Sequence, residues 1–321
     1  MINPSKPDAG QFGNAFWAIT CYFNPMRYQR RLANFRIFRD RLQLPLVAVE
    51  LAFGPEFELQ AQDAEILIQL RDGAVLWQKE RLLNIALQAL PRSCHRVAWL
   101  DCDIFFATPG WIEDANSLLD RYSLIQLFRQ VHNLSRQWAP GKDCAAEVEF
   151  TRPSAAFSLV SGIPAATCIG HLLDIRKGTC APGFAWAARR DLLDRHSFYD
   201  ACIVGGGDRA MACAAHNCFD ELMLRHCMNE HERQRYITWA EPYYEGVRAE
   251  TAFLNADIFH LWHGDVGMRK SRARFEGFQR FQFDPYIDIA IGKDGSWQWS
   301  TDKPEMHEYV RGYFASRQED G

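Results

Sequence analysis

The chain has 321 residues, 48% of them apolar and 24% charged, as in a globular protein with one large domain or two small ones. Its formal net charge of −4 argues against nucleic acid as a partner, and no apolar stretch approaches the length of a membrane span. The ten cysteines form no Cys-x-x-Cys pair, which favours a reduced, cytoplasmic chain. We therefore expect any membrane contact to be peripheral.

Residues 1–14 carry no secretory pattern, and we expect a flexible N-terminal lead. After them, short apolar runs alternate with stretches of helical periodicity. Because the runs are apolar on both faces, the pattern predicts an α/β fold with a mostly parallel sheet covered by helices. The predicted strands are 15–21, 45–52, 64–70, 97–106 and 123–128, and the predicted helices are 27–42, 77–90 and 109–122.

The second half of the chain is less regular. Polar turns and an apolar patch over 130–180 suggest loops and an ordering lid. The basic, aromatic tail 266–321 is expected to be partly helical and to pack as an extension on a catalytic domain over 15–265. We also expect a helix from the glycines before Asp208 to Cys213, a second helix over 220–232 and a short strand over 258–264.

Two carboxylates, Asp101 and Asp103, interrupt the apolar run 97–106. Ionised carboxylates are costly in such a run unless they are paired, hydrogen-bonded or bound to a metal. Residues two apart point to the same side of an extended chain, so both could converge on one hard cation and its phosphate ligand. In the alternative interpretation the strand ends at Asp101 and Asp103 caps the following turn.

Two further motifs carry groups suited to this chemistry. His260-x-x-His263 follows an apolar strand, and Mn²⁺ accepts imidazole as well as carboxylate ligands. Asp208 follows three glycines, so a ligand could approach the backbone there closely. The alternatives are a core hydrogen bond for His260, a surface position for His263 and a helix cap for Asp208.

The order of these pieces resembles a metal-dependent glycosyltransferase of the GT-A fold over about residues 15–300, most similar to the β-1,4-galactosyltransferase type. That type has a helix with a Lys/Arg-Leu-Leu-Asn segment (here within 79–84), an Asp-x-Asp strand, a Gly-Gly-acidic-Asp turn and a Met-x-x-His step. This chain departs from the pattern at Gly207, where the family often has Glu, and at His260 in place of Met. The resemblance implies a single mixed, mostly parallel sheet flanked by helices.

The resemblance also implies a function: transfer of a sugar from a nucleotide-diphosphate donor, UDP in the first place, to the hydroxyl of a carbohydrate or other acceptor. Asp103, His263 and His260 would bind Mn²⁺ or Mg²⁺, which acts as a Lewis acid on the leaving diphosphate. Asp101 would orient the ribose or the waters of the metal. Asp208 would remove the proton of the acceptor hydroxyl in an inverting displacement.

Further residues are assigned to the nucleotide-sugar site. Trp186, or Phe184, is a candidate sugar-stacking platform, with core packing as the alternative. For Arg269 and Arg272, which follow the two histidines, the alternative is an exposed position on the surface. The residues assigned are Tyr22, Asn24, Glu50, Lys79, Arg81, Asn84, Asp101, Trp186, Gly206, Gly207, Arg269 and Arg272.

Three other functions compete with this one. A sugar nucleotidyltransferase would carry a Gly-rich, Arg-containing loop after the first strand, where this chain has 22–25, Tyr-Phe-Asn-Pro. A non-catalytic carbohydrate-binding relative would be expected to lose an Asp or the downstream His. A metal-dependent nuclease would normally show more clustered carboxylates and a basic face.

Overall fold

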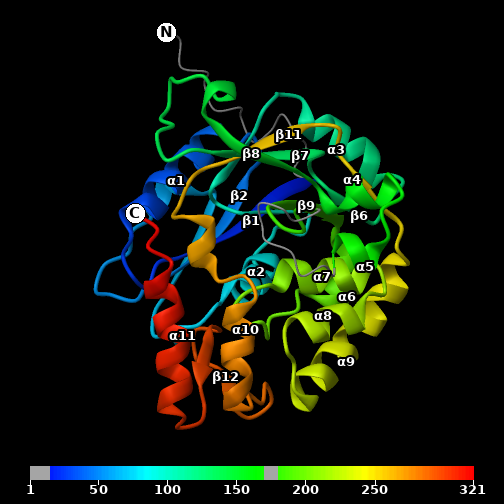
Figure 1. Cartoon of the computed structure of the whole chain (residues 1–321). Helices are drawn as coiled ribbons and strands as arrows, with labels where there is room; N and C mark the ends of the chain where they lie inside the picture. Colours follow the sequence, from blue (N-terminus) through cyan, green and yellow to red (C-terminus); the bar gives the residue numbers. More distant parts are fainter. Residues whose placement is uncertain (1–14, 170–179) are drawn as a thin grey trace.

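The computed structural model describes residues 15–169 and 180–321, so the expected lead 1–14 lies outside the described residues. A seven-stranded sheet in the order β10-β6-β9-β4-β1-β2-β3 forms the centre (Figure 1). Only β9 runs antiparallel to its neighbours, which confirms the mixed, mostly parallel sheet. The strands are β1 Phe16–Phe23, β2 Leu46–Leu51, β3 Ile66–Leu70, β4 Arg96–Leu100, β6 Leu124–Gln126, β9 Ala185–Arg189 and β10 Thr251–Phe253.

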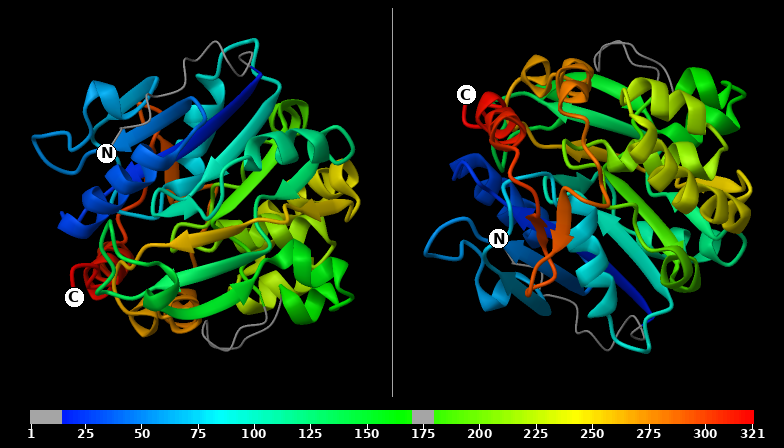
Figure 2. Two further views of the ribbon diagram at one scale, coloured as in Figure 1. Left: turned by 90° about the horizontal axis from the view of Figure 1, so that it is seen from above. Right: turned by 90° about the horizontal axis from the view of Figure 1, so that it is seen from below.

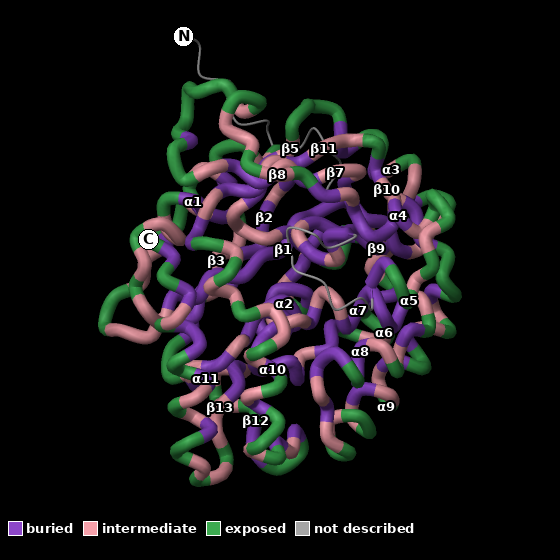
Figure 3. The backbone as a smooth tube through the Cα atoms, viewed as in Figure 1, coloured by how far each residue is buried: buried purple, intermediate pink, exposed green. Residues whose placement is uncertain are grey.

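Helices cover both faces of this sheet, because each has one apolar face to bury. Every residue of β1 and β2 is buried, as their continuous apolar runs predict (Figure 3). Phe35 and Phe38 are the buried aromatic residues of α1, and Leu82 and Leu83 are among the buried residues of α2. The helices of this half are α1 Gln29–Arg41, α2 Lys79–Gln88 and α3 Trp111–Leu119, with a 3₁₀ turn η1 at Ala61–Asp63.

A second sheet, in the order β5-β11-β7-β8, lies beside the end of β4. The prediction of loops over 130–180 is wrong in part, because β7 and β8 lie there. The sequence did not reveal β7 because it mixes polar and apolar residues and so lacks the apolar run that marks a central strand. Part of the expected lid, 170–179, lies outside the described residues. The elements are β5 Ile104–Phe106, β7 Gln130–Leu134, η2 Ala145–Glu147, β8 Val148–Pro153, α4 Ala155–Val160, α5 Ala165–Cys168 and β11 Asp257–His260.

The helix expected over 220–232 is wrong, because two helices meet there. The backbone of Cys227 adopts a positive φ of 52°, and Asn229 begins the next helix in a reciprocal capping box with Glu232. The helix expected from the glycines before Asp208 through Cys213 is confirmed as α7. The helices of this region are α6 Arg190–His196, α7 Gly207–Ala215, α8 Phe219–Arg225 and α9 Glu230–Val247.

The C-terminal segment packs on the first and second helices rather than extending away (Figures 1 and 2). The Gln78 side chain bonds both the N–H and the C=O of Trp297, and Trp77 stacks on Phe314 with 6.0 Å between ring centres. The domain boundary at 265 stays a prediction. The elements are η3 Val266–Arg269, α10 Ala273–Phe278, η4 Gln279–Phe281, β12 Ile289–Ile291, β13 Trp297–Trp299 and α11 Pro304–Ser316.

Among the helices of 15–169 and 180–321, none combines the length and the apolar composition that a membrane span requires.

Candidate functional site

The two carboxylates of the Asp-x-Asp motif lie in a turn, not in a strand. β4 ends at Leu100 and β5 begins at Ile104, so the alternative in which the strand ends at Asp101 is the correct one. The two side chains engage different partners. Asp101 accepts a hydrogen bond from Lys79 Nζ at 2.5 Å, and Asp103 lies 3.1 Å from His263 Nε2.

Asp103, His260 and His263 form a cluster that could hold a metal ion, with one ligand atom from each within 4.8 Å of the others. The two Nε2 atoms are 3.1 Å apart, and His260 Nε2 is 3.8 Å from Asp103 Oδ1. Asp103 Oδ1 is buried without a hydrogen-bond partner. Two imidazoles and a carboxylate suit Mn²⁺ better than Mg²⁺, which prefers oxygen ligands alone.

The other ring nitrogen of each histidine has an oxygen nearby. His260 Nδ1 lies 2.9 Å from Asn133 Oδ1 across the β7–β11 pair, and His263 Nδ1 lies 3.6 Å from Glu319 Oε1. An Nδ1–H of His260 directed at Asn133 leaves the Nε2 lone pair of His260 for a metal, whereas His263 Nδ1 is buried without a hydrogen-bond partner. Burial and the charge of Arg269 lower the pKa of both histidines, which favours the neutral form that binds metals.

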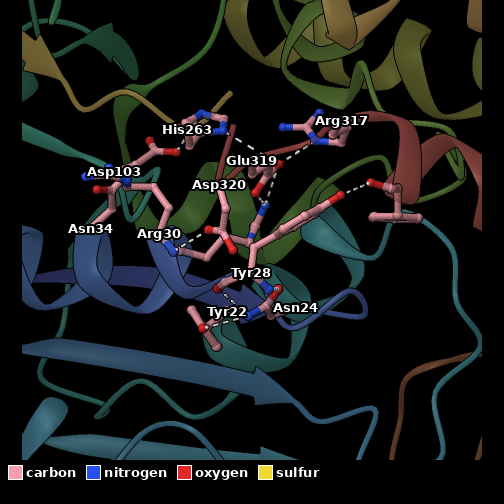
Figure 4. A network of polar contacts seen from close by, with 12 residues as sticks. Tyr22, Asn24, Tyr28, Arg30, Asn34, Asp103, His263, Arg317, Glu319 and Asp320 are labelled. Atoms are coloured by element: carbon pink, nitrogen blue, oxygen red, sulfur yellow. Dashed lines mark hydrogen bonds and ion pairs between the residues drawn. The ribbon is translucent and has the colours of Figure 1, made fainter. Parts of the chain in front are cut away.

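Glu319 comes from beyond the last helix and is almost fully buried. Arg31 Nη1 binds it at 2.9 Å and Arg317 Nε at 2.5 Å, and these charges outweigh burial and hold its pKa well below the usual range. Asp320 accepts hydrogen bonds from two N–H groups at the start of α1, which secures the segment (Figure 4). Sequence reasoning missed Glu319, because an acidic residue near the end of a polar tail carries no local signal.

Arg269, which was assigned to the nucleotide-sugar site, lines the same cleft as this cluster. Its Nη2 atom lies 2.9 Å from His263 Nε2. Its guanidinium is thus directed at the imidazole nitrogen that a metal would use. Burial and Arg317 lower the pKa of Arg269. The donor set therefore fits a divalent cation, on condition that Arg269 turns from His263 Nε2 toward an anionic ligand.

Lys79 joins Asp101 to Asp208 on the other side of the cleft. Lys79 Nζ lies 2.8 Å from each carboxylate oxygen of Asp208, and the two carboxylates outweigh burial to raise the pKa of Lys79. Burial raises the pKa of Asp208 although Lys79 opposes it. Asp208 is not the helix cap: Gly206, with φ 99°, is the N-cap of α7. The carboxylate is therefore directed at Lys79 and the cleft.

Glu80 occupies the space beside Gly207. A Cβ on Gly207 would lie 2.1 Å from Glu80 Oε1, so the glycine is required by the packing of this carboxyl group. Burial, with repulsion from Asp208, raises the pKa of Glu80 to about 8. An acidic group therefore lies beside Gly207, but it is the carboxyl group of Glu80 in α2 and not a side chain of residue 207.

The cleft that contains these groups is strongly cationic, in contrast to the net charge of the chain. Eight Lys or Arg side chains line it against three Asp side chains. Phe184 lines it as well, with its ring 4.9 Å from that of His260. The cationic residues are Arg31, Lys79, Arg152, Arg209, Arg225, Arg269, Arg274 and Arg317, and the carboxylates are Asp101, Asp103 and Asp208.

Eight of the twelve residues assigned to the nucleotide-sugar site lie outside the cleft lining, and four of these, Arg81, Asn84, Trp186 and Arg272, have partners elsewhere. Arg81 bonds Gly295 and Asp200, and Asn84 bonds the backbone of Phe198, because both project from the side of α2 that meets residues 198–200. Trp186 packs in the core, stacked on Trp99 with its Nε1–H donated to a backbone carbonyl. Arg272 pairs with Glu276 on the surface, and Arg274 faces the cleft instead.

Tyr22, Asn24 and Glu50 come together at the ends of β1 and β2 but line a separate small hollow. Glu58 accepts from both Tyr22 and Asn24, and Glu50 accepts from the backbone N–H groups of Glu58 and Leu59. Their polar groups are therefore engaged in holding the loop after β2. Gly206 lines the main cleft, and Gly207 lies behind it against Glu80.

No protein-family model matches the chain, and no curated protein does. Among solved structures it is similar to glucosyl-3-phosphoglycerate synthase from Mycobacterium tuberculosis in complex with Mn²⁺, UDP-glucose and phosphoglyceric acid, with 15% identity, 83% of this chain and 78% of that chain covered, and a TM-score of 0.41. It is also similar to S. aureus TarS 1–349 in complex with UDP-GlcNAc, with 12% identity, coverage of 73% and 74%, and a TM-score of 0.38.

A third similar structure is a 4-diphosphocytidyl-2C-methyl-D-erythritol synthase from Anaerococcus prevotii, with 11% identity, coverage of 76% and 90%, and a TM-score of 0.35. The likeness thus extends to more than one kind of enzyme. It identifies no residue or substrate of this chain, and the narrower resemblance to the β-1,4-galactosyltransferase type stays a prediction.

Proposed function

We propose that this chain is a metal-dependent glycosyltransferase of the GT-A type that moves a sugar from a nucleotide-diphosphate donor, a UDP-sugar in the first place, to an acceptor hydroxyl. The observation that carries the proposal is the Asp103–His260–His263 cluster at one end of a cationic cleft that also contains Asp208. A diphosphate is the kind of ligand that a divalent cation and several arginines bind together.

In this proposal Asp103, His260 and His263 hold Mn²⁺, which would neutralise the leaving diphosphate when bound. Asn133 keeps His260 in the tautomer that presents Nε2, and Glu319 places a negative charge 3.6 Å from His263 Nδ1. Arg269 binds a diphosphate oxygen after turning from His263. Phe184, rather than the buried Trp186, lies where a sugar ring could pack in the cleft.

Asp208 acts as the general base on the acceptor hydroxyl, so that direct displacement inverts the anomeric centre. Its burial supports this role, because a raised pKa makes a carboxylate a stronger base. Lys79 holds Asp208 and Asp101 at a fixed separation from one another. We also propose a cytoplasmic location, which is supported by ten cysteines that form no disulfide.

The test is a screen of nucleotide sugars for slow hydrolysis with Mn²⁺ present, followed by calorimetric titration of UDP. We expect chelation to abolish hydrolysis, Mn²⁺ to restore it better than Mg²⁺, and Asp103→Ala to abolish metal-dependent UDP binding. Asp114→Ala, an exposed carboxylate on α3, is the matched control. Unchanged UDP binding in Asp103→Ala with metal present would contradict the metal site. Cleavage of the nucleotide sugar by added pyrophosphate, which gives a nucleoside triphosphate and a sugar phosphate instead of sugar transfer, would favour a nucleotidyltransferase.

A further inference from the structure

Arg152 brings a positive charge from the second sheet into the main cleft. It lies in β8, it lines the cleft, and it is only 7% exposed. His260 of β11 is opposite Asn133 of β7, which is opposite Phe150 of β8. Directly opposite residues, and residues two apart in one strand, point to the same face of a sheet. Arg152 therefore lies on the same face as His260.

Contacts on this face place Arg152 at the metal end of the cleft. Its Cζ atom is 5.6 Å from the centre of the Phe184 ring, and that ring is 4.9 Å from the ring of His260. Burial, with repulsion from Arg269, lowers the pKa of Arg152 to about 10. Burial also lowers the pKa of His260, and the charges of Arg269 and Arg152 add to this effect. Arg152 and Arg269 are thus two cations that repel each other beside the metal cluster.

Arg152 is a buried cation without an anionic partner among the described residues. Within that part of the chain its side chain forms neither a salt bridge nor a hydrogen bond, and its Nε is buried without a partner. Other buried arginines differ, since Arg39 Nη2 binds Glu65 at 2.6 Å and Arg317 Nε binds Glu319 at 2.5 Å. A desolvated cation is unfavourable unless an anion pairs with it. The position of Arg152 is therefore suited to an anion that comes from a ligand.

Arg269 can supply a second guanidinium to the same anion. Its Nη2 lies 2.9 Å from His263 Nε2, the atom that a metal would use. The guanidinium would have to leave His263 when a metal binds, and it would then turn into the cleft that Arg152 also lines. Two guanidiniums next to a divalent cation suit an anionic ligand, because its oxygens can accept charge-assisted hydrogen bonds and bind the metal at once.

From this arrangement we infer that Arg152 and Arg269 form an anion site beside the metal cluster, and that this site binds an anionic group of the nucleotide-sugar donor. The donor can supply the group from two sources, a phosphate of the diphosphate or a carboxylate on the sugar. The metal cluster next to the site favours the diphosphate. Phe184, the proposed sugar platform, favours the carboxylate, since Arg152 packs against its ring. The inference rests on the proposed function for the identity of the donor, whereas the anion site itself does not.

Titrations of four ligands separate these cases. UDP, UDP-glucose and UDP-glucuronic acid are titrated with Mn²⁺ present, and inorganic phosphate is titrated without metal. The proteins are wild type, Arg152→Gln, Arg152→Lys and the control Arg272→Gln, whose guanidinium pairs with Glu276 on the surface. The thermal midpoint of each unliganded protein shows whether it is folded.

We expect Arg152→Gln to weaken the binding of UDP-glucuronic acid about tenfold or more, because the variant loses charge-assisted hydrogen bonds. Equal weakening of all three nucleotides assigns Arg152 to the diphosphate, and weakening of UDP-glucuronic acid alone assigns it to the sugar carboxylate. Arg152→Lys keeps the charge but not the planar guanidinium and should lose less, and Arg272→Gln should bind as wild type does. The midpoint of Arg152→Gln should stay close to that of wild type, because the charge it removes has no anionic partner among the described residues.

Wild-type affinity of Arg152→Gln for all three nucleotides would overturn the inference. Loss of the folded state in both Arg152 variants would also overturn it, because Arg152 would then be a structural support of Phe184. If wild type binds none of the nucleotides, the proposed function fails and the phosphate titration decides on the anion site. Phosphate binding that Arg152→Gln weakens keeps the site, and phosphate binding that is absent or unchanged overturns it.

Discussion

Asp101 and Asp103 are separated by one residue, yet they belong to two differently built ends of the cleft. Asp103 faces two neutral imidazoles, and one of its oxygens is buried without a partner. Asp101 shares the ammonium of Lys79 with Asp208, so its charge is already balanced by the protein. The comparison teaches that only the Asp103 end needs a further cation, whereas the Asp101 end is preorganised by the chain itself.

The largest expected effect is at the Lys79 end. Asp208→Asn should reduce turnover roughly 10²–10⁴-fold, because the variant lacks the general base, while UDP and Mn²⁺ affinities stay near wild type. Turnover, thermal midpoint and UDP titration should be measured on the same preparation. Asp194→Asn, an exposed position on α6, is the control. Near-normal turnover would remove Asp208 from the mechanism.

Removal of the shared cation tests the preorganisation itself. Lys79→Met should lower the free energy of unfolding by about 3 kcal/mol, because two partly buried carboxylates lose their common partner. Urea denaturation of the variant and of wild type measures this loss of stability. Lys142→Met, which breaks an exposed pair with Glu147, should cost much less, because solvent screens that pair. Equal losses in the two variants would mean that Lys79 is no more important than a surface lysine.

At the Asp103 end, the metal affinity should depend on a residue that touches no metal. Glu319→Gln should weaken Mn²⁺ binding about 10–100-fold, because the His263 imidazole loses the carboxylate near its Nδ1. Glu308→Gln, exposed on α11, is the control, and calorimetry with Mn²⁺ on the folded proteins is the measurement. Unchanged Mn²⁺ affinity in Glu319→Gln would reduce Glu319 to a partner of Arg31 and Arg317.

The smallest effect concerns Glu80, whose folded-state pKa of about 8 lies above the ordinary value of 4.5. Between these two pH values the folded state binds more protons than the unfolded state, so stability falls as pH rises through this window. Glu80→Gln removes this dependence. The variant should match wild type near pH 5 and melt a few degrees higher, about 2–4 °C, near pH 8.5. A difference between the two proteins that is constant with pH would contradict the raised pKa.

The sequence by itself predicted five of the seven strands of the central sheet, all but β9 and β10, and the chemical types at its edge. Continuous apolar runs predicted β1 and β2. The apolar run before Asp101 predicted β4, and the two carboxylates of the motif follow the end of that strand. The resemblance to a metal-dependent glycosyltransferase grouped His260 and His263 with Asp103, because Mn²⁺ accepts both imidazole and carboxylate ligands. These features are local, because burial of a strand and the ligand preference of a metal are readable within a few residues.

Only the tertiary structure decided which partner each group has. Asn133 reaches His260 through the pairing of β7 with β11, and Glu319 reaches His263 from the far end of the chain. Glu80 fills the place beside Gly207 because α2 packs against the start of α7. Such contacts depend on segments more than fifty residues apart, and a polar residue carries no periodicity that would reveal which distant neighbour it meets.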